Sequence, residues 1–170
     1  MTPGEKALAI QEIRACKAKY WHYMDMKRWD DLKQVFTRDV IADFRGERDL
    51  KPGEPMSKLP PVAEALAKGD PAASQGRDRL VDQLYKGLLQ DWVTFHLGGE
   101  PIIELTGPDT ATGMWPLFDY ISHKDRALKA YGHYHDQYRI EDGQWRIAYM
   151  SLTRVRMDGQ HPAEAAFATS

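Results

Sequence analysis

Hydrophobic residues recur at helical spacing along the first part of the chain. Residues 2–5 form a T-x-x-E capping box with a proline at the first helical position, which marks the start of a helix. The periodic pattern ends near Asp25, so we expect one long helix up to that residue. A shorter helix over 29–36 and a strand over 40–45 are expected to follow.

The second half of the chain is dominated by patterns typical of β-strands. A helix is first expected at about 77–90, where leucines form an apolar face. Turn residues at 107–109 and an Asp-Gly pair at 142–143 then predict hairpins. The glycine pair at 98–99 is expected to bend the first strand as a bulge. The predicted strands are 92–105, 111–122, 128–140 and 145–157.

Residues 46–75 differ from the rest because prolines and glycines interrupt them repeatedly. This composition predicts a long loop with one helical turn near 62–67. A loop of this length inside a small domain is usually functional or mobile, so we interpret it as a lid. The tail, 159–170, is expected to be loosely ordered.

The order of these elements predicts an α+β fold. Helices come first and long antiparallel strands come last, which is typical of that class. Strands of this length, bent by bulges, are expected to form a cone-shaped curved sheet packed against the N-terminal helices and enclosing a pocket. We expect a single domain over residues 1–170 with its core at about 5–158.

Composition excludes several classes of partner. The chain has 170 residues, of which 42% are hydrophobic and 28% charged, with a formal net charge of -2. This balance offers no basic field for nucleic acid, and no apolar run is long enough for a membrane span. The single cysteine, Cys16, cannot form an internal disulfide and indicates a reducing, cytoplasmic location. Its position in a helical pattern favours a small buried side chain over a nucleophile.

Polar residues on otherwise apolar faces are the candidates for chemistry, since the chain contains no diagnostic short motif. Asp119 lies on a strand whose two faces are both apolar, so it needs a partner, a proton or an escape to solvent. His96 precedes the glycine pair and is a possible general base, although a single strand histidine is more often structural.

Three further residues have a functional and a structural interpretation. Asp25, at the C-terminal end of a helix, opposes the helix dipole and requires compensation, either from a histidinium partner or from a bond to the turn that starts the second helix. Tyr20 has a phenol that would donate to a leaving group, or it is a core aromatic residue. Arg154 continues an apolar strand face and would bind a carboxylate or carbonyl, or reach the surface.

The spacing of the histidines in His133-Tyr134-His135 is compatible with a metal site, because residues two apart on a strand share a face. His96 or Asp119 would have to supply a third ligand. Cross-strand pairing explains the segment without metal, and we expect no metal and no cofactor.

Several short segments are typical of one known family. They are 20–25 (YWHYMD), 29–30 (WD), Phe36, 94–96 (TFH), 132–136 (GHYHD), 142–147 (DGQWRI) and 152–156 (LTRVR). On these segments the chain resembles the SnoaL-like branch of the nuclear transport factor 2-like superfamily over about residues 5–158. That superfamily holds dehydratases, isomerases, cyclases and non-enzymes, so the resemblance is specific for the fold rather than for an activity.

The analogues within that branch are bile acid 7α-dehydratase-like, scytalone dehydratase-like and dehydrochlorinase-like lyases. The bile acid and dehydrochlorinase types use a histidine base oriented by an aspartate, which implies His96 as base and Asp25 as its partner. The tyrosine of the bile acid enzyme, five residues before that aspartate, matches Tyr20. Its second aspartate matches Asp119 in place.

The resemblance also implies an arginine on the final strand. Arg154 is the candidate, with Tyr149 as the alternative occupant of that position. The first-helix lysine of the dehydrochlorinases has no matching residue, and Lys17 and Lys19 lie nearby.

The first functional hypothesis is a cofactor-free lyase of the dehydratase type. Asp25 would orient His96, which removes a proton, while Tyr20 or Asp119 protonates the departing oxygen. An apolar wall predicts a hydrophobic ring compound such as a steroid, terpenoid or polyketide. The residues expected in that wall are Trp21, Met24, Trp92, Phe95, Trp115, Leu117 and Met150.

Two other functions stay open at this point. One is a non-catalytic module that binds a small ligand or a protein, with aromatic residues lining an interface. The other is a ketosteroid-type isomerase with Asp119 or Asp25 as base and Tyr20 as donor. An apolar outer sheet face also predicts a homodimer, with a homotrimer as second choice. The proposed interface residues are Tyr131, Tyr134, Tyr138, Trp145 and Tyr149.

Overall fold

A computed structural model describes residues 1–160 of the chain. Its first element is the helix α1 (Pro3–Asp25), and the short helix α2 (Trp29–Lys33) follows. Thr2 caps α1 through the expected capping box, in which the Thr2 side chain accepts from the Glu5 backbone and the Glu5 side chain accepts from the Thr2 backbone. The predicted first helix and its end at Asp25 are therefore confirmed.

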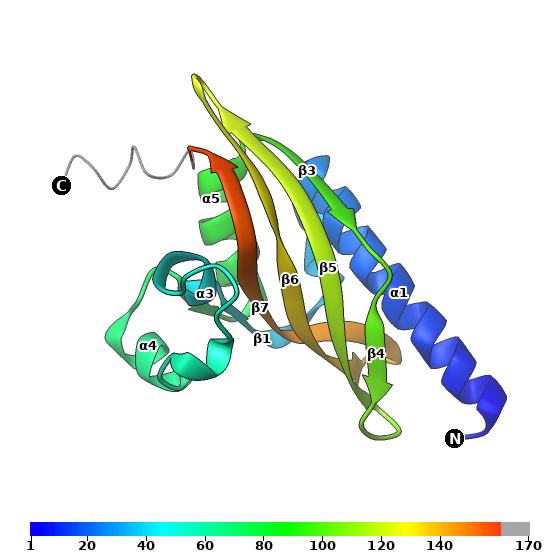
Figure 1. The fold of residues 1–170 in the computed structure, drawn as a ribbon. Coiled ribbons are helices and arrows are strands. Elements are labelled where there is room, and N and C mark those ends of the chain that lie inside the picture. The colour runs from blue at the N-terminus through cyan, green and yellow to red at the C-terminus, as the bar shows by residue number, and fades with distance from the viewer. Residues whose placement is uncertain (161–170) are drawn as a thin grey trace.

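The strands form a curved sheet, with α1 packed behind its β3 and β4 edge (Figure 1). Within residues 1–160, seven strands make this sheet in the order β2-β1-β7-β6-β5-β3, and β4 pairs with β5. β1 and β7 run parallel, whereas every other pair is antiparallel. The strands are β1 (Phe36–Asp43), β2 (Ala73–Gln75), β3 (Val93–Gly98), β4 (Ile102–Leu105), β5 (Thr110–His123), β6 (Arg126–Glu141) and β7 (Gln144–Gly159).

The predicted α+β architecture and the last hairpin are confirmed. Asp142 and Gly143 both have positive φ, 54° and 74°, as a two-residue turn between β6 and β7 requires. The predicted strand 92–105 is wrong as one element. It is split into β3 and β4, because the backbone leaves the ladder at residues 99–101.

The proline-rich segment contains more structure than the expected loop. It holds the helix α3 (Arg45–Asp49), a 3-10 turn (Met56–Lys58), the helix α4 (Val62–Lys68) and strand β2. Ion pairs hold these pieces, including Arg48 to Asp70 at 2.8 Å and Arg45 to Asp43 at 2.8 Å. The predicted helical turn at 62–67 corresponds to α4.

The helix predicted at 77–90 is present but irregular. Its middle, Arg79–Tyr85, has π-helical hydrogen bonding, and α5 (Lys86–Leu89) continues it. π-helical turns frequently occur at functional sites. This one places the buried Tyr85 against α1.

The core lies between α1 and the inner face of the sheet. On β5 and β6 alternate residues are buried, as a half-covered antiparallel sheet requires. Within residues 1–160, no helix combines the length and apolar character that crossing a membrane requires. Of the predicted loose tail, Gly159 belongs to β7 and residues 161–170 lie outside the described part of the chain.

Candidate active site

Asp25 and His96 meet on the inner side of the sheet. Asp25 is the last residue of α1, and His96 lies on β3 with its side chain facing that helix. The Asp25 Oδ1 is 2.7 Å from His96 Nδ1, and Asp25 Oδ2 accepts the His96 backbone N–H at 2.9 Å. The exposed fractions of the two side chains are 7% for His96 and 16% for Asp25, so water has little access to the pair.

Neighbouring side chains hold Asp25 in place. The Thr94 hydroxyl donates to Asp25 Oδ1 at 2.9 Å, and Lys27 Nζ donates to the Thr94 hydroxyl at 3.0 Å. These donors and the His96 N–H stabilise a carboxylate where the helix dipole disfavours one. Burial lowers the pKa of Lys27, with the Asp25 charge acting in the opposite direction.

This arrangement selects one form of the histidine ring. A carboxylate only accepts hydrogen bonds, so it favours the tautomer that carries its proton on Nδ1. Within residues 1–160, no hydrogen bond engages His96 Nε2, whose lone pair therefore stays available to accept a proton.

Asp119 and Arg154 form a second charged group next to the first. Asp119 is the direct cross-strand partner of His96, so the two side chains neighbour each other on the inner face. Arg154 binds Asp119 in a bidentate manner, Nη1 to Oδ1 at 2.9 Å and Nη2 to Oδ2 at 3.0 Å. Its Nη2 also donates to Glu47 of α3 at 2.8 Å.

The Asp119–Arg154 group is almost completely buried. The exposed fraction is 2% for each of the Asp119 and Arg154 side chains. The Glu47 and Asp119 charges keep the pKa of Arg154 above its ordinary value although burial opposes this. Tyr149 has a different environment, with burial raising its pKa and Ser151, Asp43 and Arg45 among the groups that act on it. Arg154, rather than Tyr149, therefore reaches the Asp119 side of the site.

Tyr20 lies in a buried group of phenols. Its hydroxyl oxygen is 3.3 Å from that of Tyr85 and 3.2 Å from that of Tyr134. The Tyr85 hydroxyl also donates to the Met150 sulfur at 3.6 Å. Burial raises the pKa of Tyr20 and Tyr134 well above the ordinary value, so both phenols keep their protons at neutral pH.

A third charged group is a buried ion pair that the sequence did not predict. Lys17 on α1 and Asp136 on β6 approach to 2.7 Å, and neither side chain has exposed surface. Burial lowers the pKa of Lys17 and raises that of Asp136, while their mutual attraction opposes both shifts. Helical spacing puts Lys17 on the face of Tyr20, but only the fold shows that β6 supplies the opposite charge.

Several residues that were expected to line an interface or a pocket wall lie elsewhere in the structure. Tyr134, Tyr138 and Trp145 are core residues with exposed fractions of 3%, 1% and 7%, so they line no exposed interface. Phe95 is 52% exposed and points away from His96, because successive residues of a strand alternate between faces. Trp92 packs with Ile121 in a separate small cluster.

His133, His135 and Cys16 were further candidates from the sequence, and their contacts are typical of structural side chains. His133 and His135 lie on the outer side of β6, with the rings 6.4 Å apart and His135 Nε2 3.1 Å from the Thr153 hydroxyl. Over residues 1–160 no group of three or more His, Cys, Asp or Glu side chains is arranged to hold a metal ion. Cys16 is buried, and burial raises the pKa of its thiol to about 12, as expected for a packed side chain.

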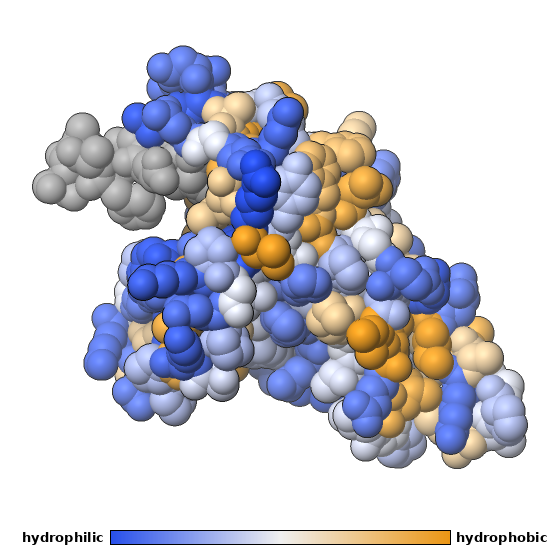
Figure 2. All heavy atoms as spheres, viewed as in Figure 1, coloured by the Kyte–Doolittle hydropathy of each residue, from blue (hydrophilic) through white to orange (hydrophobic). Residues whose placement is uncertain are grey.

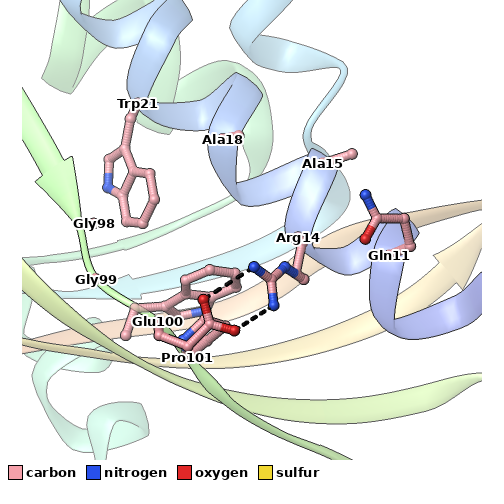
Figure 3. A pocket seen from close by; sticks show the side chains of 10 residues that line it. Gln11, Arg14, Ala15, Ala18, Trp21, Gly98, Gly99, Glu100 and Pro101 are labelled. Carbon is pink, nitrogen blue, oxygen red and sulfur yellow. Dashed lines mark hydrogen bonds and ion pairs between the residues drawn. The ribbon is translucent and has the colours of Figure 1, made fainter. Parts of the chain in front are cut away.

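A hollow of about 360 Å³ opens between α1 and the β3–β4 junction (Figure 3). Trp21 and Trp115 line it in an edge-to-face arrangement, and Arg14 pairs with Glu100 across it. A Cβ on Gly98 would lie 1.8 Å from the Trp21 ring, so only glycine fits there. Asp25, His96 and Tyr20 do not line this hollow, and a pocket enclosed around His96 stays a prediction.

Comparison with known proteins identifies the family. The model of the SnoaL-like domain matches residues 5–151. The chain belongs to the SnoaL-like family. The matched range includes every residue of the Asp25–His96 pair, the phenol group and the buried Lys17–Asp136 pair.

Solved structures share the same fold at low identity. A protein from Novosphingobium aromaticivorans, provisionally assigned as a scytalone dehydratase, has a TM-score of 0.70 at 18% identity, covering 95% of this chain and 93% of that one. A hexachlorocyclohexane dehydrochlorinase, LinA type 2, has a TM-score of 0.68 at 11% identity, covering 93% of each chain. A Mycobacterium tuberculosis protein of unknown function has a TM-score of 0.68 at 22% identity, covering 92% of this chain and 77% of that one.

Proposed function

We propose that this SnoaL-like protein is a lyase that catalyses a dehydratase-type elimination with His96 as the base. The observation that carries the proposal is the hydrogen bond between Asp25 and His96 Nδ1, which leaves Nε2 available for a proton. Two structurally similar proteins have names that imply elimination reactions. One is provisionally assigned as a scytalone dehydratase and the other is a dehydrochlorinase.

In the proposed reaction, His96 Nε2 takes a proton from a carbon next to a carbonyl or another activating group. The electron pair of the broken C–H bond forms a carbon–carbon double bond, and the C–O bond to the leaving group breaks. That oxygen takes a proton from the Tyr20 hydroxyl and departs as water. His96 then releases its proton to solvent and Tyr20 regains one, so the protein returns to its starting state.

Tyr20 suits the role of acid better than Asp119. Both Asp119 oxygens accept hydrogen bonds from the terminal nitrogens of Arg154 and are therefore already engaged. The phenol of Tyr20 retains its proton at neutral pH because burial raises its pKa. Asp119 and Arg154 would instead hold the strands and α3 in position around His96.

The substrate is proposed to be a hydrophobic ring compound with one oxygen function, such as a steroid, terpenoid or polyketide. Met24, Leu117 and Met150 are buried apolar residues near the candidate groups, and no phosphate-binding loop is found in the sequence. The segment 46–75 contacts Arg154 through Glu47, so we propose that it moves as a lid to admit the substrate.

A ketosteroid-type isomerase is less well supported, because it would use an aspartate base that faces the substrate. Both candidate aspartates are occupied, Asp25 by His96 and Asp119 by Arg154. A non-catalytic binding module remains the second candidate. The limited exposure of His96, 7% for the side chain, argues against a purely surface role for it.

The outer face of the sheet supports the proposed homodimer. Hydrophobic side chains gather on this face over the strands (Figure 2). Val93, Phe95, Leu97 and Val155 have exposed fractions of 61%, 52%, 57% and 54%. Pairing of two copies would remove this surface from water. Light scattering at micromolar concentration is expected to report a species of twice 19.5 kDa, and a purely monomeric species would contradict the proposal.

A cytoplasmic location also stays a prediction.

The test of the proposed reaction begins with a thermal-shift screen of steroids, terpenoids and polyketides, since a ligand of the native state raises the melting temperature. Compounds that bind are then assayed for loss of water. His96→Ala is expected to lower turnover on the order of 10²–10⁴-fold, the usual contribution of a general base. His133→Ala, on the outer face, is the matched control and should retain turnover. Full turnover by His96→Ala would overturn the mechanism.

A further inference from the structure

A charged pair that the proposed reaction does not use lies beside Tyr20. Lys17 Nζ is 2.7 Å from Asp136 Oδ2, and the exposed fraction of both side chains is 0%. The Tyr138 hydroxyl donates to the same carboxylate oxygen at 2.8 Å. Burying two charges costs several kcal/mol for each ion, about as much as the pair recovers, so stability alone does not explain the pair.

The lysine end of this pair faces aromatic rings. Lys17 Nζ is 3.7 Å from the centroid of the Tyr134 ring and 4.7 Å from that of the Tyr20 ring. Lys17 and Tyr20 are three residues apart on α1, which places their side chains on one helix face. Asp136 approaches from β6, so the ammonium is the charge that lies against the two rings.

The phenols that Lys17 contacts are linked to each other by their hydroxyls. Tyr20 is 3.2 Å from Tyr134 and 3.3 Å from Tyr85, oxygen to oxygen. A phenol that donates its proton gains negative charge, and a nearby cation stabilises that charge strongly in a buried site. Without a cation, burial alone would oppose proton donation by Tyr20.

We propose that the Lys17–Asp136 pair polarises Tyr20, its ammonium stabilising the negative charge that develops on the phenol during proton donation. The inference rests on the proposed function, in which Tyr20 protonates the leaving oxygen. Lys17 acts through the Tyr20 ring and does not touch the substrate, so it is a positioning residue. Asp136 holds the ammonium in place from the opposite side.

The test measures the acidity of Tyr20 itself and needs no substrate. Tyr20 is replaced by 2,3,5-trifluorotyrosine, whose ring fluorines make the phenol more acidic, and its ionisation is followed by fluorine NMR as the pH rises. The measurement is made in the otherwise unchanged protein and in Lys17→Met/Asp136→Asn. This double variant removes both charges at similar volume, whereas Lys17→Met alone would leave Asp136 buried and unpaired.

The double variant is expected to make the phenol at position 20 about threefold less acidic or more, which is less than a lone buried charge would cause, because the ammonium and the carboxylate that it removes act in opposite directions. The matched control is Asp43→Asn/Arg45→Met, which removes another buried pair, joined at 2.8 Å, but leaves the Lys17 ammonium against the Tyr20 ring. The control should leave the ionisation of the phenol unchanged.

Two outcomes separate this inference from the function on which it rests. Equal ionisation of the phenol in the double variant and the unchanged protein would overturn the role of Lys17, whatever the activity. Full turnover by Tyr20→Phe on an identified substrate would overturn the acid role of Tyr20, whatever the ionisation. If both ideas hold, Lys17→Met/Asp136→Asn should lower kcat and leave KM unchanged, because Lys17 does not contact the bound substrate.

Discussion

The Asp25–His96 pair and the Asp119–Arg154–Glu47 group lie next to each other on the inner face of the sheet, and they differ in what their polar atoms still offer. His96 has one ring nitrogen bonded to Asp25 and the other available. Both oxygens of Asp119 accept hydrogen bonds from Arg154, whose Nη2 also binds Glu47. The first group is therefore suited to proton transfer and the second to holding strands and α3 in position.

The largest effect is expected at the second group. Arg154→Met is expected to reduce the free energy of unfolding by about 3–5 kcal/mol, because it leaves Asp119 as a buried charge without its partner. Urea denaturation measures the effect. Arg156→Met, on the exposed end of the same strand, is the control and should leave the denaturation midpoint unchanged. An equally small effect of Arg154→Met would show that Asp119 does not depend on this arginine.

At the first group the expected effect is on activity. Asp25→Asn should lower turnover on the order of 10²–10⁴-fold, because an amide can donate to Nδ1 and favour the ring form whose Nε2 already carries a proton. Stability should change little, since the amide oxygen can still accept the His96 N–H. Steady-state kinetics together with thermal melting check both parts. Asp30→Asn, an exposed acid on α2, serves as the control, and equal loss of activity in both variants would contradict the role of Asp25.

A smaller effect is expected when only the hydrogen bonds that support Asp25 are weakened. Thr94→Val removes the hydroxyl that links Lys27 to Asp25 and should cost about 0.5–1.5 kcal/mol of stability, as for a typical hydrogen bond. Activity should fall only several-fold, because the Asp25–His96 contact itself remains. Thr94→Ser retains the hydroxyl and is expected to behave like the unchanged protein in melting and kinetic assays. A valine variant with unaltered melting would show that this link is dispensable.

Local patterns in the sequence determine much of the fold. The capping box and helical spacing define α1 up to Asp25, and the Asp142-Gly143 pair defines the last hairpin because few residue pairs adopt positive φ together. Alternation on β5 puts Trp115, Leu117 and Asp119 on one face of the strand, and the structure shows that this face is the buried one. The break between β3 and β4 was not predictable in the same way, since a glycine pair permits either a bulge or an interruption of the ladder.

The candidate residues were identifiable one at a time, but their relations were not. His96 and Asp25 are 71 positions apart, and only the packing of α1 against β3 brings their atoms to 2.7 Å. Residue type and strand face likewise indicate that Asp119 needs a partner. They do not specify that Arg154, rather than solvent or a proton, satisfies it.

The sequence by itself determined which elements form, which faces are buried and which side chains have reactive groups, because each depends on neighbours along the chain. Only the tertiary structure decided which of those groups keeps an available atom. Lys17 shows the reason, since its α1 position favours a place beside Tyr20, whereas the charge that balances it comes from Asp136 on a distant strand, β6. Long-range contacts of this kind depend on how α1 packs against the sheet, which spacing along the chain does not encode.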